Sequence, residues 1–193
     1  MKEHAHPSDE GSDEWSRQHT QKGERREPEL APAKQALLEA IHLQPGFRVL
    51  DVACGAGDTT AAAAAAGAVA MGIDTSRAMI RIARQRFPGL CFEEGDMALP
   101  SAGPWDGIVC RLGAHHAPST WITAAYRELK PGGRLAIAER DATDAESRAN
   151  GMKSLDEWME LLKAAGFQDV TAKPTAADLG GRIHTVSGRR PGA

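Results

Sequence analysis

At residues 49–58 the chain reads Val-Leu-Asp-Val-Ala-Cys-Gly-Ala-Gly-Asp, and this stretch decides the fold. An apolar run carrying one acidic residue, Asp51, gives way at once to a glycine-containing turn. The alanine-rich segment 59–66 follows, so the unit is predicted to be a strand, a tight loop and a helix. Because glycine has no Cβ, Gly55 and Gly57 allow a ligand to approach the backbone closely. The stretch therefore predicts a small-molecule site at the end of a strand.

The chemistry of this loop distinguishes between two nucleotide-type cofactors. A dinucleotide site holds a pyrophosphate and has a third glycine three residues after the second, where this chain has Thr60. Asp51 and Asp58 also bracket the loop with negative charge. A carboxylate about 4 Å from a phosphate oxygen repels it by about 1 kcal/mol in water and about 4 kcal/mol at an effective dielectric constant of 20. S-adenosylmethionine carries an ammonium and a sulfonium group, so the loop is expected to favour it over NAD.

Five motifs in register resemble those of a known family, the class I S-adenosylmethionine-dependent methyltransferases. The first is the stretch at 49–58, and the later ones lie at 71–76, 94–97, 105–111 and 129–135. Within the family, residues 111–116 are similar to a segment of small-molecule enzymes grouped near the ubiquinone and menaquinone C-methyltransferases. The resemblance implies methyl transfer from S-adenosylmethionine to an oxygen, carbon, nitrogen or sulfur atom of a small molecule. The product of the cofactor is then S-adenosylhomocysteine.

Composition narrows the expected partners. The 193 residues, 41% hydrophobic and 25% charged, suit one soluble globular domain, and a formal charge of −3 provides no electrostatic footprint for nucleic acid or an anionic membrane. No apolar run approaches the roughly 20 residues of a membrane span, and the N-terminus lacks the apolar core of a secretion signal. Cys54, Cys91 and Cys110 lie in apolar elements and are expected to be buried, reduced thiols. We therefore expect a cytoplasmic protein with a small-molecule substrate, no nucleic-acid partner and no membrane partner.

The order of predicted elements indicates an α/β protein. Strands are expected at about 48–53, 69–73, 90–93, 106–110 and 133–139, and helices at about 32–43, 59–66, 76–86, 119–129 and 154–165. This alternation predicts parallel strands with helices on both faces, and Ser76 and Ser119 are expected to cap two of the helices. Strands at 167–173 and 182–187 have no helix between them, which favours an antiparallel hairpin. Pattern and resemblance together imply a doubly wound, Rossmann-like, mainly parallel sheet of seven strands that ends in this hairpin.

The N-terminal residues 1–28 are predicted to form a flexible arm, and residues 29–193 the S-adenosylmethionine-binding domain. The arm is dense in charge and its one large apolar side chain is Trp15, which is either exposed or the anchor of a lid over the cofactor. His4 and His6 are expected to be solvated, and no metal site is predicted. The link from the fifth strand to Ser154 is short. The acceptor site is therefore expected to be open, or completed by the arm or by the second subunit of a homodimer.

The expected cofactor contacts lie at the ends of the first strands. Asp51 is expected to receive the methionine ammonium, with capping of the following loop as the alternative. Asp74 suits the ribose hydroxyls, although it can also cap the next helix. Asp96 is expected to accept from the adenine amino group beside the backbone N–H of Met97, or to stabilise a turn. The remaining expected contacts are Gly55 and Gly57 under the methionine and ribose, and Thr75 and Met79 on the adenine face, with a place in the core as the alternative for Met79. Arg111 is expected to line the methionine pocket, to bind a substrate anion or to form a surface ion pair.

The loop after the fourth strand carries the candidate catalytic residues, His115 and His116. A histidine that is partly neutral at pH 7 can take a proton from a hydroxyl or an acidic carbon, and His116 is preferred as this base. The alternatives are a structural role and half of a metal site. Glu139 and Arg140 are expected to point toward the acceptor, and Asp141 and Asp144 to be solvated. 

Two other functions remain open. The chain could bind S-adenosylmethionine without transferring the methyl group, as a cyclase-type enzyme or an accessory subunit. An NAD-dependent oxidoreductase is disfavoured by Asp51 and Thr60.

Overall fold

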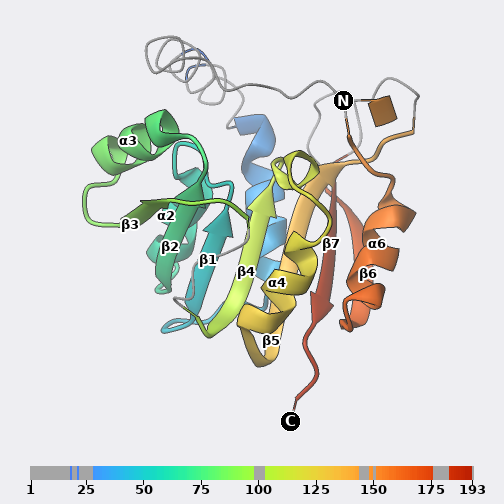
Figure 1. Cartoon of the computed structure of the whole chain (residues 1–193). Coiled ribbons are helices and arrows are strands. Elements are labelled where there is room, and N and C mark those ends of the chain that lie inside the picture. The colour runs from blue at the N-terminus through green and yellow to red at the C-terminus, as the bar shows by residue number, and fades with distance from the viewer. Residues whose placement is uncertain are drawn as a thin grey trace.

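A seven-stranded sheet forms the centre of the computed structural model, which describes residues 18, 21, 28–97, 103–143, 148–149, 151–175 and 183–192 (Figure 1). In chain order the strands are β1 (Arg48–Val52), β2 (Val69–Asp74), β3 (Cys91–Glu94), β4 (Trp105–Arg111), β5 (Leu129–Arg140), β6 (Gln168–Thr175) and β7 (Ile183–Arg189). Their order across the sheet is β3-β2-β1-β4-β5-β7-β6. The pairs β5–β7 and β7–β6 are antiparallel and the others parallel. The predicted Rossmann-like fold class, with its C-terminal antiparallel hairpin, is confirmed.

Helices cover both faces of this sheet. They are the helix 28–40, α2 (Asp58–Ala65), α3 (Arg77–Arg86), the 3₁₀ turn η1 (Ala114–His116), α4 (Trp121–Glu128) and α6 (Leu155–Ala164). Figure 1 shows α4 and α6 on one face and the blue helix 28–40 on the other. Successive side chains of β1 alternate between the two cores, so Leu50 packs with Trp121 in one core and Val49 with Leu37 in the other. None of the helices in the described ranges has the length and apolarity that a membrane span needs.

Two of the sheet's helices begin at side-chain caps. The Ser76 hydroxyl accepts a hydrogen bond from the Met79 backbone at 3.3 Å, which confirms the predicted cap of α3. Ser154 and Glu157 form a reciprocal capping box at the start of α6. The backbone N–H of the first residue of α6 donates to Asp141 at 3.0 Å. The expectation that Asp141 is solvated is therefore wrong, because its half-buried carboxylate helps to hold the helix start.

Three further expectations need correction. Ser119 does not cap α4, because Thr120 occupies the cap position and the Ser119 carbonyl accepts from the following turn. Cys91 is exposed, since it lies on the edge strand β3, whereas Cys54 and Cys110 are buried; all three are free thiols. The strand expected at 133–139 begins earlier, at Leu129, and the helix expected at 32–43 spans 28–40.

Part of the predicted N-terminal arm and of the fifth-strand link lies outside the described residues. This applies to His4, His6, Trp15 and Asp144.

The middle of β2 approaches the glycine loop so closely that it has no room for a side chain. A Cβ on Gly72 would lie 2.7 Å from the Phe92 ring, 2.8 Å from the Cys54 sulfur and 2.8 Å from the Thr60 hydroxyl. These three groups come from β3, from the loop after β1 and from α2. Gly72 is therefore the point at which three elements around the loop pack onto one strand.

We expect Gly72→Ala to lower the free energy of unfolding by about 1–3 kcal/mol, because the added methyl group overpacks this junction. Gly89→Ala is the matched control, because Gly89 is exposed and no described atom lies within 4 Å of its Cβ position. Urea denaturation of both variants measures the difference. Equal stability of the two variants would show that the junction can relax at no cost.

Candidate functional site

The carboxyl ends of β1, β2 and β4 lie side by side at one edge of the sheet. Asp51 pairs with Gly72 of β2 on one side and with Val109 of β4 on the other. Asp74 is the last residue of β2, and Arg111 the last residue of β4. Because ligands of open α/β sheets bind at the carboxyl edge, the topology brings three of the predicted site residues to the expected place.

Asp51 is a buried carboxylate with one unused oxygen. The residue is 1% exposed, and the Thr60 hydroxyl donates to its Oδ2 at 2.7 Å. Its Oδ1 is buried and has no hydrogen-bond donor among the described residues. Burial raises the pKa of Asp51 to about 7, and the hydrogen bond from Thr60 and the nearby charge of Arg111 limit the rise. A buried acceptor without a donor is costly, so Oδ1 is a position where a ligand's N–H group is favoured.

Asp74 holds the glycine loop and the next helix together. Its Oδ2 accepts from the Gly55 backbone at 2.9 Å and its Oδ1 from the Ser76 backbone at 2.8 Å. The alternative reading of Asp74 as a residue that organises the start of α3 is therefore supported, and its contact with ribose hydroxyls stays a prediction. Gly55 has a φ of 54°, and no described atom lies within 4 Å of its Cβ position. The loop thus presents bare backbone to open space.

Gly57 has a different surrounding from Gly55. Its φ is 90°, and a Cβ there would lie 2.7 Å from the Phe92 ring. The absence of a side chain therefore makes room for Phe92 packing and for the turn into α2. The predicted contact of Gly57 with the cofactor remains untested and involves its backbone.

Asp58 is paired with a cation that the sequence did not reveal. Arg86, the last residue of α3, donates to both Asp58 carboxylate oxygens at 2.8 Å and to the Ala56 carbonyl at 2.9 Å. A bidentate pair of this kind neutralises the Asp58 charge. The expectation that Asp51 and Asp58 both make the loop negative is therefore wrong for Asp58, and the free acceptor at Asp51 is the feature that remains.

The other predicted cofactor residues lie at or just after the ends of β2, β3 and β4, at the same edge. The Gly95 backbone donates to the Asp74 carbonyl at 3.0 Å, which ties the end of β3 to the end of β2. Asp96 and Thr75 are exposed, and Met97, Met79 and Arg111 are half-buried. The fold thus brings these residues to one edge, and their individual contacts with a cofactor stay predictions.

A buried carboxylate orients one of the two candidate histidines. The Nδ1 atom of His115 lies 2.8 Å from Oε2 of Glu139, and the side chains are 11% and 2% exposed. Glu139 ends the apolar part of β5, and its Oε1 accepts from the Arg140 backbone at 3.2 Å. His116 is exposed, and its ring lies 3.9 Å from that of His115. The preference for His116 as the base stays a prediction, but the geometry favours His115.

This histidine turn packs directly on the turn that follows β1. Ala53 and Leu112 both have a φ of 56°, so the chain bends sharply after each strand. A Cβ on Gly113 would lie 2.5 Å from the Cβ of Ala53. Because Gly113 precedes η1, the His115–Glu139 pair and the glycine loop belong to one continuous edge.

Sequence reasoning missed several residues of this edge. Thr60 and Arg86 bind carboxylates from positions that no local pattern connects with the loop. His184 lies opposite Glu139 in the β5–β7 register, and its Nδ1 is buried without a partner among the described residues. Only the place of Glu139 at the end of an apolar strand was visible beforehand.

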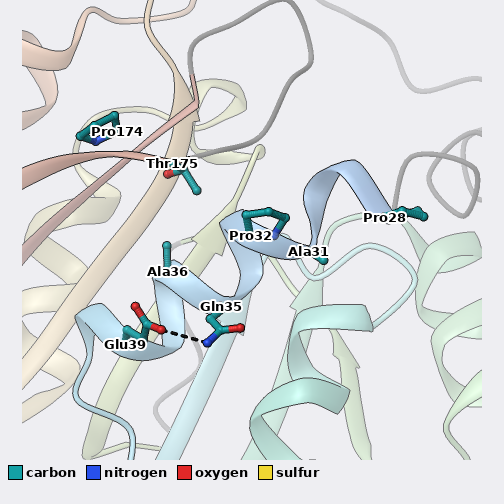
Figure 2. A pocket seen from close by; sticks show the side chains of 8 residues that line it. All are labelled: Pro28, Ala31, Pro32, Gln35, Ala36, Glu39, Pro174 and Thr175. Atoms are coloured by element: carbon teal, nitrogen blue, oxygen red, sulfur yellow. Dashed lines mark hydrogen bonds between the residues drawn. The ribbon is translucent and has the colours of Figure 1, made fainter.

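A separate groove of about 450 Å³ lies between the helix 28–40 and the end of β6 (Figure 2). Its lining comprises Pro28, Ala31, Pro32, Gln35, Ala36, Glu39, Pro174 and Thr175. It shares no residue with the glycine loop or with the His115–Glu139 pair. We therefore do not assign the cofactor to this groove.

Known proteins match the central part of the chain. Residues 49–133 match a family model described as a methyltransferase domain. The chain is 34% identical over 110 residues to a demethylmenaquinone methyltransferase of Renibacterium salmoninarum. The aligned region covers 55% of this chain and 46% of that protein. It is 30% identical over 154 residues to a trans-aconitate 2-methyltransferase of Azoarcus sp., with 77% and 60% covered. The chain thus spans about half the length of the curated relatives it matches.

A solved structure shares the fold over most of the chain. The N-methyltransferase NodS of Bradyrhizobium japonicum superposes with a TM-score of 0.72 at 19% identity, covering 85% of this chain and 97% of NodS. At this identity the likeness concerns the fold alone. The match at 49–133 and the two named relatives confirm the family resemblance that the sequence motifs predicted.

We expect Asp51→Asn to stabilise the protein increasingly as the pH rises from 4 to 7. Over this window the folded chain keeps the Asp51 proton while the unfolded chain releases it, so the wild-type protein loses stability that the variant does not lose. The difference in unfolding free energy should grow by up to about 4 kcal/mol. Urea denaturation at several pH values measures it.

Asp156→Asn serves as the control, because Asp156 is exposed on α6 and its replacement should leave the pH dependence unchanged. A constant difference between Asp51→Asn and wild type across the window would contradict the buried, costly carboxylate.

Proposed function

We propose that this protein, whose residues 49–133 match a methyltransferase domain, binds S-adenosylmethionine and transfers its methyl group to a small-molecule acceptor. One observation carries the proposal. The buried Oδ1 of Asp51 has no donor among the described residues, and it lies at the carboxyl end of β1, where bare backbone at Gly55 borders open space.

The residues present fit this cofactor. An ammonium group supplies the donor that Asp51 lacks, and the positive charge of the ligand favours the ionised form of this carboxylate. The Gly55 backbone leaves room for the amino-acid part. In this proposal the ribose hydroxyls bind Asp74, at the end of the next strand, and the adenine binds at Asp96, Met97, Thr75 and Met79. Arg111 borders the amino-acid end.

The task of the chain in this reaction is positioning. S-adenosylmethionine, when bound, supplies a reactive methyl group on a positively charged sulfur and leaves as S-adenosylhomocysteine. Alignment of an acceptor with such a group can contribute about 7–11 kcal/mol to the lowering of the barrier. The histidine turn η1 packs on the loop after β1, so His115 and His116 are the candidates for removing a proton from the acceptor.

The names of the relatives support a small-molecule acceptor. One relative is named for demethylmenaquinone and another for trans-aconitate, two unlike small molecules. The names of the relatives therefore do not identify one acceptor, and we infer the acceptor class from the residues of this chain. We also propose, from the sequence, a division into an arm and a domain at residue 28, a cytoplasmic location and a homodimer.

Incubation with S-adenosylmethionine and candidate acceptors tests the transfer itself. Formation of S-adenosylhomocysteine supports methyl transfer, whereas tight binding without this product supports the alternative of a cyclase-type or accessory protein. Tight binding of NADH in place of S-adenosylmethionine would overturn both.

We expect the affinity for S-adenosylmethionine to rise about 15-fold between pH 5.5 and pH 7. Over this range the ionised fraction of a carboxyl group with a pKa of about 7 rises from about 3% to about 50%, while a ligand ammonium stays protonated. Asp51→Asn should bind more weakly and lose this rise. Titration calorimetry of both proteins in matched buffers measures the effect. A parallel pH dependence in the two proteins would contradict a contact between Asp51 and the ligand.

We also expect Asp74→Ala to weaken S-adenosylmethionine binding about 10- to 100-fold, because buried hydroxyl groups of the ligand lose their acceptor. The Gly55 loop loses its anchor as well. Ser76→Ala is the control, since it removes the hydrogen bond to Met79 and keeps the Asp74 carboxylate. Calorimetry gives the dissociation constants, and circular dichroism checks that the variants are folded. An unchanged constant in folded Asp74→Ala would refute the ribose assignment.

A further inference from the structure

We propose that Glu139 positions His115 as the base of the reaction, and that the acceptor is therefore an oxygen or carbon acid. This inference rests on the proposed methyl transfer and specifies its acceptor class.

The pair has the geometry of an oriented base. His115 Nδ1 and Glu139 Oε2 are 2.8 Å apart, and neither side chain is more than 11% exposed. The two residues come from different elements, η1 and β5, so the contact depends on the folded sheet. A buried carboxylate that accepts from one ring nitrogen holds the ring in one orientation. His116 lies exposed beside it, with its ring 3.9 Å from that of His115.

This arrangement determines which nitrogen is available to a substrate. When the His115 ring is neutral and Glu139 accepts from Nδ1–H, the other nitrogen, Nε2, carries a lone pair. The second carboxylate oxygen of Glu139 is engaged by the Arg140 backbone N–H at 3.2 Å. Glu139 therefore acts on the reaction through His115, as a positioning residue.

The turn that carries His115 lies next to the glycine loop. Gly113, which precedes η1, contacts the turn at Ala53 so closely that a Cβ there would lie 2.5 Å from the Cβ of Ala53. Ala53 is two residues from Asp51 and two from Gly55. An acceptor that reaches Nε2 of His115 is thus held at the same edge as the glycine loop.

A base of this kind matters for some acceptors and not for others. A carboxylic acid, with a pKa near 4, is already ionised at pH 7, whereas a phenol-type hydroxyl with a pKa near 10 is ionised in only about one molecule in a thousand. An aromatic amine is neutral at pH 7 and already carries the lone pair that attacks. The buried pair therefore indicates phenols, enols or carbon acids flanked by carbonyl groups.

The proposed step is balanced. The acceptor's O–H or C–H proton passes to Nε2 of His115, and the electron pair left on the acceptor forms the new bond to the methyl carbon. The electron pair of the broken carbon–sulfur bond stays on sulfur, which becomes a neutral thioether. His115 is then an imidazolium beside the Glu139 carboxylate, and it returns the proton to water.

The first experiment compares His115→Asn and Glu139→Gln with two matched controls. His42→Asn replaces an exposed histidine whose φ of 53° asparagine tolerates, and Glu160→Gln replaces an exposed glutamate of α6. The first two variants should lose about 100-fold or more in kcat with 1-naphthol as acceptor, and the controls should keep wild-type rates. The dissociation constant for S-adenosylmethionine should stay within about twofold in all four.

The second experiment reads the ring directly and needs no turnover. Nitrogen-15 NMR of the imidazole rings, assigned with His115→Asn, should show His115 protonated on Nδ1 in the neutral wild-type protein. In Glu139→Gln the amide oxygen keeps the Arg140 N–H and the amide NH₂ faces Nδ1, so the proton should move to Nε2. If the His115 tautomer is unchanged in Glu139→Gln, the contact is purely structural and the positioning role is overturned.

The third experiment tests the acceptor class with probes of defined chemistry. Production of S-adenosylhomocysteine with 1-naphthol or acetylacetone, and none above background with benzoate or aniline, is the expected result. Turnover of benzoate or aniline alone, loss of rate in His116→Asn but not in His115→Asn, or no turnover of any probe by protein that binds S-adenosylmethionine would each overturn this inference. Failure to bind S-adenosylmethionine would instead overturn the proposed function.

Discussion

The parallel pairing of β1 with β2 and β4 is the constraint on which the rest of this structure depends. Each strand of the parallel part runs in the same direction, so their last residues and the turns after them meet at one edge. Asp51, Asp74 and Arg111 reach this edge only because the connecting helices return the chain to the opposite side. Any arrangement that broke one of these pairings would scatter the carboxylates as well as the backbone turn between them.

At this edge the buried carboxyl group of Asp51 lowers the stability of the folded protein. Asp51 is buried, its pKa is raised to about 7, and one of its oxygens has no donor in the described structure. A folded chain without a ligand bears this cost throughout the neutral pH range. In the proposed function this cost has a use, because a cationic ligand would supply the missing donor.

Two turns connect the glycine loop with the histidine turn η1. The chain takes a positive φ at Ala53 and at Leu112, and Gly113 fits against Ala53 where a larger residue would not. This contact places η1 over the loop after β1, and the buried Glu139 on β5 then reaches His115. The glycine loop and the oriented histidine are thus packed as one unit.

The amino-acid sequence by itself determined the element order, the mainly parallel sheet with its hairpin, and the edge at which Asp51, Asp74 and the histidines lie. These features depend on local periodicity and on short motifs, which are legible along the chain. Only the tertiary structure decided that Arg86 neutralises Asp58, that Phe92 occupies the space beside Gly57, and that Glu139 orients His115 rather than His116. The physical reason is that each of these contacts joins residues from separate elements, and such pairs are chosen by the packing of helices on the sheet.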